Sequence, residues 1–315
     1  MDIFKETTRL PVDIFYSRND PNDIRLGDLV KHRKPEYDES NIVILGIPQD
    51  TGVKRNKGRI GARDAPTAVR RELYKLAAPE SFNKLSLYDL GNLKIAKTLE
   101  ATHDRQIKVV EQVLRDDKKL IVIGGGHDIT YPDFKAFSNI SSTCALLNID
   151  THLDVRESDR RNSGTSYRMI LDEHLLDPGC LYQIGIQPFA NSSAYMKYVM
   201  DKKVNIYTLD DVRRLGVNTI HNDIFSTIKC DKIFISFDMD AVRSADAPGV
   251  SASYPKGLSV EEMIYLSHHT GRDGRASVME VAEVNPKHDV ENRTSKLGAL
   301  LVWEYLYGLV NKNNK

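Results

Sequence analysis

Short apolar runs alternate with longer segments of helical periodicity from about residue 40 onward. The runs are rich in Val, Ile and Leu and have no polar face, which is typical of strands in a parallel sheet covered on both sides. They predict strands over 41–46, 85–90, 119–123, 144–150, 181–186, 204–209, 232–238 and 276–281. Apolar residues three and four apart predict helices over 65–75, 102–114, 129–137, 166–175, 194–200, 217–228, 259–271 and 294–309. Ser259 and Glu262 predict a capping box at the start of one of these helices.

This alternation indicates an α/β fold with three layers, α/β/α, around a central, mostly parallel, eight-stranded sheet. A closed eight-stranded barrel has the same alternation and is the competing fold. Residues 1–40 contain turn residues, notably over 19–23, so we expect an irregular N-terminal segment packed on a single domain that spans 1–315. The last predicted helix is apolar on most sides, which favours burial in the core over a subunit contact.

The formal net charge of the chain is zero, because it has 44 basic and 44 acidic residues. No global field therefore favours nucleic acid or an anionic membrane, and we expect neither as a partner. The basic cluster at 54–59 is short, and we interpret it as a solvated loop. Cys144, Cys180 and Cys230 lack metal-type or paired spacing, which fits a reducing compartment. The N-terminus also lacks the apolar stretch of a secretory signal, so we expect a cytoplasmic protein.

Histidine and carboxylate side chains follow four of the predicted strands. The segments read Gly-Gly-Gly-His at 124–127, Asp-Thr-His-Leu-Asp at 150–154, Ser-Phe-Asp-Met-Asp at 236–240 and Glu-Val-Asn-Pro at 283–286. Loops beyond the carboxyl ends of parallel strands converge on one crevice, and ligands bind there. Taken singly, each segment has an ordinary structural explanation, such as a helix cap, a phosphate-binding turn or a hydrogen-bonded histidine.

Taken together, the segments predict a metal centre. Residues 150, 152 and 154 alternate by two, so an extended chain presents all three on one side. Without a cation the cluster would leave charges unpaired, and it holds too many carboxylates for one ion. Oxygen and imidazole ligands suit Mn²⁺ or a similar divalent ion. The candidate ligands are His127, Asp150, His152, Asp154, Asp238 and Asp240. The remaining histidines, interpreted as surface or packing residues, are His32, His103, His174, His221, His268, His269 and His288.

These motifs closely resemble those of the arginase–agmatinase–formimidoylglutamase (ureohydrolase) superfamily. The resemblance covers nearly the whole chain, from 42–48 through 61–66 to 283–286. It implies the α/β/α fold, a cofactor of two Mn²⁺ ions, a small-molecule substrate and a homo-oligomer, commonly a trimer or hexamer. It also implies that His127, Asp150, Asp154 and Asp238 hold one ion, and that Asp150, His152, Asp238 and Asp240 hold the other.

The chemistry of such a centre follows from the resemblance. Two cations roughly 3.5–4 Å apart lower the pKa of a shared water, and the hydroxide attacks the carbon of a guanidinium or amidinium group. Asp150 or Asp154 would take and return the proton. Glu283 would pair with the cationic C–N group in a charge-assisted contact, the alternative being a helix cap or a surface glutamate.

Arg156 indicates a substrate with an additional carboxylate. Many ureohydrolases have asparagine at this position, two residues after Asp154, and a guanidinium fork binds carboxylate through two hydrogen bonds. The chain resembles the formimidoylglutamase branch at Arg156, over 162–168 and over 184–189. We therefore expect a metal-dependent hydrolase that cleaves N-formimidoyl-L-glutamate to L-glutamate and formamide, late in histidine breakdown.

Arg156, with Asn162 and Ser163 as weaker candidates, would bind the carboxylate of this substrate. An ion pair of Arg156 with Glu157 or Asp159 is the alternative. Two other functions stay open at this point. One is a different ureohydrolase, such as an arginase, an agmatinase or a guanidino-acid hydrolase, and the other is a catalytically silent binding or regulatory protein of the same fold.

The chain departs from the usual superfamily pattern at three places. Where arginases and agmatinases have a histidine in the loop after the second motif, Ser163 or Tyr167 stands here. The acids that arginases carry after their Ile-Gly strand are Gln187 and Pro188, which weakens recognition of a free α-amino group. Arg243 follows the third motif in place of the usual Asp-Pro, as either a second carboxylate clamp or a structural contact.

Overall fold

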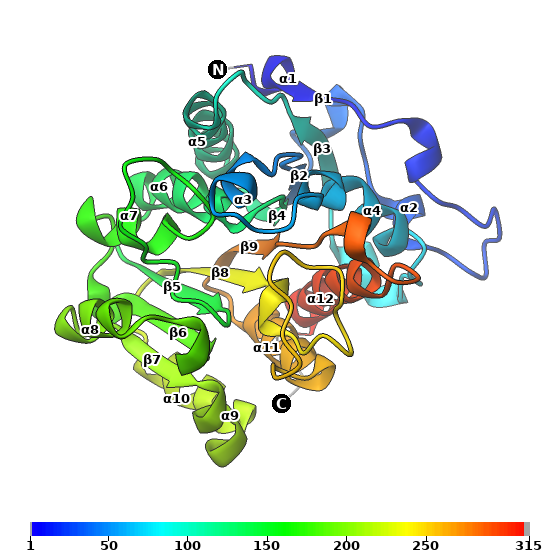
Figure 1. Cartoon of the computed structure of the whole chain (residues 1–315). Coiled ribbons are helices and arrows are strands. Elements are labelled where there is room, and N and C mark those ends of the chain that lie inside the picture. Colours follow the sequence, from blue (N-terminus) through cyan, green and yellow to red (C-terminus); the bar gives the residue numbers. More distant parts are fainter. Residues whose placement is uncertain (1, 312–315) are drawn as a thin grey trace.

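The computed structural model describes residues 2–311, and its strands form one open, nine-stranded sheet (Figure 1). Eight of the strands are those that the sequence predicts, and all eight run parallel. The α/β/α prediction is confirmed, and the barrel is wrong because the sheet does not close. In spatial order the strands are β1 (Thr7–Thr8), β3 (Leu87–Leu93), β2 (Ile42–Gly46), β4 (Lys119–Ile123), β9 (Ala276–Ala282), β8 (Lys232–Asp238), β5 (Cys144–Ile149), β6 (Leu181–Ile186) and β7 (Asn205–Thr208).

The ninth strand, β1, is an addition to the predicted sheet. It pairs antiparallel with β3, with Thr7 opposite Leu93 and Thr8 opposite Asn92. Two residues are too few to show a strand periodicity, so no sequence pattern indicated it. The short helix α1 (Ile3–Glu6) lies near β1, and the short helix α2 (Leu26–Leu29) lies beside α4 (Ala65–Leu73). No helix among residues 2–311 combines the length and the apolar content needed to cross a membrane.

Helices cover both faces of the sheet (Figure 1). On one face lie α5 (Leu99–Arg115), α6 (Thr130–Ile140), α7 (Ser166–Asp172) and α8 (Ser193–Asp201). On the other lie α4 (Ala65–Leu73), α9 (Leu209–Leu215), α10 (Val217–Thr227), α11 (Val260–Arg272) and α12 (Arg293–Val310). Successive strand residues face opposite layers: Ile44 joins one buried cluster and Leu45 the other. All the predicted helices are present, and the predicted capping box of Ser259 and Glu262 begins α11.

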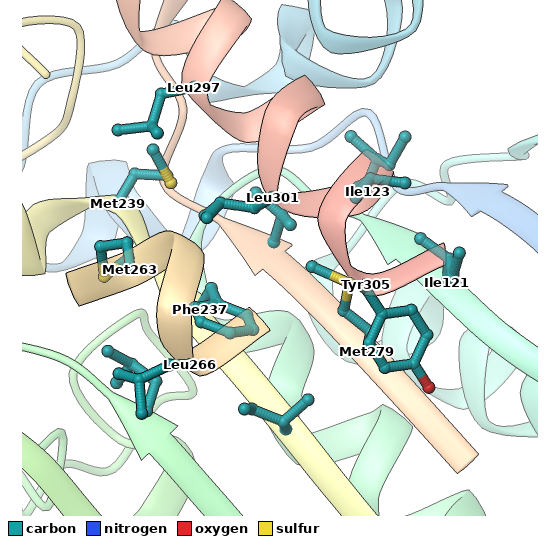
Figure 2. Close-up of a cluster of buried hydrophobic side chains, with 14 of the residues drawn as sticks. Ile121, Ile123, Phe237, Met239, Met263, Leu266, Met279, Leu297, Leu301 and Tyr305 are labelled. Atoms are coloured by element: carbon teal, nitrogen blue, oxygen red, sulfur yellow. The ribbon is translucent and has the colours of Figure 1, made fainter. Parts of the chain in front are cut away.

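The larger core lies between the sheet and the helices α11 and α12, as Figure 2 shows. Its members include Met263 and Leu266 of α11, Leu297, Leu301 and Tyr305 of α12, and Ile123, Phe237 and Met279 of the strands. Full burial of such side chains stabilises the fold by about 1.5–3 kcal/mol each. The predicted burial of the last helix is therefore confirmed, and this core holds β4, β9 and β8 beneath the loops at their carboxyl ends.

Candidate metal centre

The six predicted ligands lie at the carboxyl ends of three strands, β4, β8 and β5, and the predicted substrate residue Glu283 follows β9, which lies between β4 and β8. His127 begins the 3₁₀ turn that follows β4, and Asp150 directly follows β5. Asp238 is the last residue of β8, and Asp240 lies in the 3₁₀ turn after it. Glu283 directly follows β9. The topology thus brings together motifs that are far apart in the sequence, as expected for parallel strands.

One half of the cluster surrounds the imidazole of His127. Its Nδ1 lies 3.3 Å from Asp150 Oδ2, 3.0 Å from Asp154 Oδ2 and 2.9 Å from Asp238 Oδ2. The potential ligand atoms of these four residues all lie within 4.8 Å of one another. This spacing allows the four side chains to hold a single ion.

The other half shares two carboxylates with the first. Asp150 turns its second oxygen, Oδ1, to His152, whose Nδ1 is 3.5 Å away and whose backbone N–H donates to it at 2.7 Å. Asp238 Oδ1 accepts the backbone N–H of Asp240 at 2.6 Å. The Asp240 carboxylate in turn accepts the N–H of Ala252, at 3.0 Å for its Oδ2. Asp150 and Asp238 therefore lie between the two halves, as ligands that bridge two ions would.

The carboxylates carry more negative charge than the surrounding residues neutralise. Burial, together with the charge of Asp150, raises the pKa of Asp238 to about 6. Burial and the charges of Asp238 and Glu283 raise the pKa of Asp240 well above its usual range. Burial, then Asp238, raises the pKa of Glu283 to about 8. Among the described residues, no Lys or Arg forms an ion pair with these three acids. Hard divalent cations fit this oxygen and imidazole set and would supply the missing charge.

Hydrogen bonds behind the cluster fix the orientation of the His127 ring. Its Nε2 lies 2.9 Å from Ser236 Oγ, and that hydroxyl donates to Glu280 Oε1 at 2.6 Å. Because Ser236 gives its only proton to Glu280, its oxygen is left to accept from Nε2, and Nδ1 faces the carboxylates, where it would ligate an ion. The sequence analysis assigned no role to Ser236 or Glu280, although Glu280, an acid inside the apolar strand β9, was a signal.

Two residues of the cluster have left-handed backbone conformations. Asp154 has φ 48° and Glu283 has φ 63°, a region that costs a non-glycine residue about 1–2 kcal/mol. Such strain concentrates at functional sites. Glu283 is 3% exposed, and it accepts the backbone N–H of His127 at 2.8 Å and the hydroxyl of Ser251. It is thus a buried acid that joins two loops, which rules out the surface glutamate.

A cavity of about 300 Å³ opens onto the cluster. The acids and the imidazole on its floor are His152, Asp154, Asp238, Asp240 and Glu283. Its walls include Asn56, Lys57, Arg156, Ser163, Ser251 and Tyr254. His127 and Asp150 do not line it, and they are 1% and 0% exposed. A small molecule in this cavity would contact part of the cluster directly.

Comparison with known proteins agrees with this geometry. The Arginase family model matches residues 40–308. The chain belongs to the arginase family. A formimidoylglutamase of Staphylococcus haemolyticus (strain JCSC1435) is 33% identical over 92% of this chain and 95% of that protein. The predicted superfamily is therefore confirmed.

Solved structures of arginase-family proteins share the fold. The formiminoglutamase of Trypanosoma cruzi, solved with Mn²⁺, matches with a TM-score of 0.86 and 30% identity, over 92% of this chain and 99% of that one. The formimidoylglutamase of Bacillus subtilis matches with a TM-score of 0.87 and 29% identity, over 93% and 94%. Since each covers nearly the whole of both chains, the shared architecture includes the strand ends that carry the cluster.

Two of the three candidate carboxylate-binding residues of this arginase-family chain face the cavity. Arg156 lines it, and among residues 2–311 it forms no ion pair with Glu157, Asp159 or any other acid. Gly164 makes room for it, since a Cβ there would lie 2.6 Å from Arg156 Cδ. Ser163 also lines the cavity and accepts the side-chain amide of Asn56 at 3.0 Å.

Asn162 lies away from the cavity. Its amide donates to Arg160 O at 3.0 Å and to Ser158 Oγ at 3.3 Å, and its Oδ1 accepts the N–H of Gly164 at 3.0 Å. These bonds shape the loop and use the groups that a carboxylate would need. The prediction that Asn162 binds substrate therefore finds no support in its position.

The departures from the family pattern have local structural roles. Arg243 donates to Asp246 at 2.6 Å and does not line the cavity, so of its two interpretations the structural contact holds. Gln187 donates to Thr151 Oγ1 at 2.9 Å, which ties the end of β6 to the loop after β5. Of the two residues aligned with the absent histidine, Ser163 faces the cavity and Tyr167 is buried beside His127.

Proposed function

We propose that this arginase-family protein hydrolyses N-formimidoyl-L-glutamate to L-glutamate and formamide, with two Mn²⁺ ions as its cofactor. One observation carries the proposal: a two-sided His/Asp cluster forms the floor of a cavity whose wall presents the unpaired guanidinium of Arg156. Proteins similar over nearly the whole chain are formimidoylglutamases, and one of them is solved with Mn²⁺. The reaction consumes one water and breaks the bond between the amidine carbon and the glutamate nitrogen.

The six predicted ligands would hold the ions in two overlapping sets. When bound, the ions lower the pKa of a shared water and so supply hydroxide near neutral pH. The placement of Asp150 and Asp238, each with one oxygen toward either half, supports their role as the shared ligands. One set is His127, Asp150, Asp154 and Asp238, and the other is Asp150, His152, Asp238 and Asp240.

Glu283 and Asp154 would act on the substrate. Both line the cavity, and Glu283 presents a buried carboxylate to a cationic amidine there. Glu283 would be ionised beside bound cations, and its carboxylate would orient the amidine through a charge-assisted bond. Asp154 reaches the cavity whereas Asp150 does not, so Asp154 is better placed to take the proton of the attacking water and return it to the departing nitrogen.

A substrate panel tests the proposal. Protein produced with manganese is assayed with N-formimidoyl-L-glutamate, L-arginine and agmatine, and the products are identified by mass spectrometry. We expect turnover of the first compound only, with L-glutamate and formamide as products, loss of activity on chelation and its return on addition of Mn²⁺. Turnover of arginine or agmatine alone would reject the substrate, and ammonia with formylglutamate would reject the cleaved bond. Absence of metal after growth in manganese would favour the catalytically silent protein.

The same proposal extends to the assembly and location of the protein. The family resemblance supports a single domain over 1–315 and a trimer or hexamer of identical chains, and the three free cysteines suit the cytoplasm. Balanced charge supports the absence of nucleic-acid and membrane partners. Light scattering of the purified protein measures the assembly, and a monomer would contradict it.

A further inference from the structure

The basic segment 54–59 borders the cavity: its residues 56–58 line it, while the side chains of Lys54, Lys57 and Arg59 are exposed. On one side it is attached to the loop that carries Arg156. Arg55 donates to the backbone oxygen of Arg161 at 2.9 Å, and the Asn56 amide donates to Ser163 Oγ at 3.0 Å. The interpretation of 54–59 as a solvated loop overlooked these bonds, because their partners lie about a hundred residues further along the chain.

On its other side, the segment is attached to the loop before α11. Arg59 donates to the backbone oxygens of Pro248 and Val250, and its own N–H reaches Ser251 O at 3.4 Å. Ser251 also donates to Glu283 on the cavity floor. Both arginines of the segment therefore serve as structural attachments, and they fix the backbone between two walls of the cavity.

Lys57 lies between these attachments and has a different environment. It lines the cavity, and among residues 2–311 its side chain forms no hydrogen bond or ion pair. Its backbone is left-handed, with φ 65°, a conformation that glycine adopts without cost and that disfavours lysine by about 1–2 kcal/mol. A lysine at such a position contributes nothing visible to the fold, which leaves its ammonium group to be explained.

The cavity wall thus presents two cations, Lys57 and Arg156, and neither has an acid partner within the described part of the chain. The acids of the cavity lie on the floor, where they belong to the metal cluster. N-formimidoyl-L-glutamate has two carboxylates, and Arg156 accounts for one of them. We propose that Lys57 binds the second carboxylate, so that the cavity selects amidines of dicarboxylic amino acids. This inference rests on the proposed function for its substrate.

The physical basis is charge-assisted hydrogen bonding between an ammonium and a carboxylate in a partly enclosed site. A neutral amide in place of that carboxylate leaves the ammonium without its partner, and a site built for a polar group rejects analogues that lack it. Lys57 therefore acts as a specificity residue. It does not need to touch the reacting carbon.

The test compares Lys57→Gln with Lys54→Gln. Lys54 is a matched control. It belongs to the same basic segment and, like Lys57, is exposed and has no side-chain partner within residues 2–311, but it lies outside the cavity lining. The substrates are N-formimidoyl-L-glutamate and its two monoamides, with the amide at either carboxyl group. We expect wild type and Lys54→Gln to disfavour both monoamides, and Lys57→Gln to lose roughly tenfold discrimination against one of them. Unchanged discrimination against both in Lys57→Gln would overturn the inference.

A binding measurement separates this inference from the proposed function. Calorimetry with manganese-loaded protein and N-formyl-L-glutamate, which has both carboxylates but no amidine, requires no turnover. We expect roughly tenfold weaker binding in Lys57→Gln and no change in Lys54→Gln. If Lys57→Gln binds N-formyl-L-glutamate more weakly but wild type does not turn over N-formimidoyl-L-glutamate, the proposed substrate is rejected and the carboxylate site is retained. Equal binding in all three proteins, or none in wild type, would reject the site itself.

Lys57→Gly controls for folding. Because glycine prefers the left-handed backbone at this position, the variant should unfold at the same temperature as wild type or higher. We expect it to bind N-formyl-L-glutamate as weakly as Lys57→Gln does, and Lys57→Arg to restore much of the affinity. A glycine variant that binds normally would show that the ammonium is not used.

Discussion

Strands β5 and β8 have ionisable side chains at both ends, and the two ends behave differently. Asp150 and Asp238 lie at the carboxyl ends. At the opposite edge, Cys144 begins β5, Cys230 precedes β8 and Cys180 precedes the neighbouring strand β6. These three thiols line a second cavity, of about 660 Å³. Residue types that bind metals therefore gather at both edges of one sheet.

The difference between the edges lies in charge. Burial, followed by the other two thiols, raises the pKa of Cys144 to about 12, and burial also raises the pKa of Cys180 and Cys230. The thiols therefore stay neutral, and Cys230 donates to Lys232 O at 3.2 Å. The carboxylates share a crowded site in which full ionisation requires cations. A group of ligating residues indicates a metal centre when its charges lack any other partner.

The largest expected effect tests the carboxyl edge. Asp238→Asn removes a carboxylate shared by both halves of the cluster, so activity should fall by roughly a thousandfold or more, as for loss of a central catalytic group. Kinetics together with metal analysis would measure this. Without metal, the variant should have an unfolding temperature at least as high as that of metal-free wild type, because repulsion among the acids is relieved. Asp159→Asn, at an exposed position, is the control, and a fully active Asp238→Asn with two ions would contradict the bridging role.

A smaller effect is expected on the wall above that edge. Arg156→Ala should raise KM for N-formimidoyl-L-glutamate roughly tenfold or more, because a charge-assisted, bidentate contact is lost, while the manganese content stays the same. Arg156→Lys keeps the positive charge but loses the bidentate guanidinium, so its KM should lie between those of wild type and Arg156→Ala. Unchanged kinetics would remove Arg156 from the substrate site, and loss of manganese would give it a structural role instead.

The smallest effect is expected at the edge of the sheet where the strands begin, which carries the three cysteines. Replacing Cys144, Cys180 and Cys230 by alanine should leave kcat, KM and manganese content unchanged, because the thiols are neutral and far along the strands from the cluster. Lost packing should lower the free energy of unfolding by about 1 kcal/mol per residue. Thermal unfolding and kinetics of the triple variant would measure both. A loss of bound metal would show that the cysteines contribute to metal binding, and would contradict the difference between the two edges of the sheet.

Much of the fold follows from local sequence because most strands are buried on both faces. The longer strands are mostly apolar and, apart from the half-buried β7, mostly buried, whereas β1 has two threonines and no pattern. Helix α9 was missed because only Leu209 and Val212 of its seven residues are buried. Which strands are neighbours could not be read from the pattern alone. The six candidate ligands could still be expected to lie together, because every parallel strand ends at the same edge.

The substrate residues were harder to predict because they depend on loops. Asn162 and Lys57 both lie in polar loops. The sequence suggested Asn162 as a substrate residue and gave Lys57 no role, whereas Lys57 lines the cavity and Asn162 does not. Asn162 satisfies its amide within its own loop, as asparagine commonly does. Lys57 faces the cavity because Arg55 and Arg59 attach its segment to distant loops. Such attachments are tertiary and leave no local signal.

The burial of His127 and Asp150 determines how the centre can exchange its ions. Neither residue reaches the surface. Within the described part of the chain, the cavity lined by His152, Asp154, Asp238 and Asp240 opens toward them. Metal and substrate would then use the same entrance. A dicarboxylate bound at that entrance would block it. The rate at which a chelator removes manganese should therefore fall while product or inhibitor is bound.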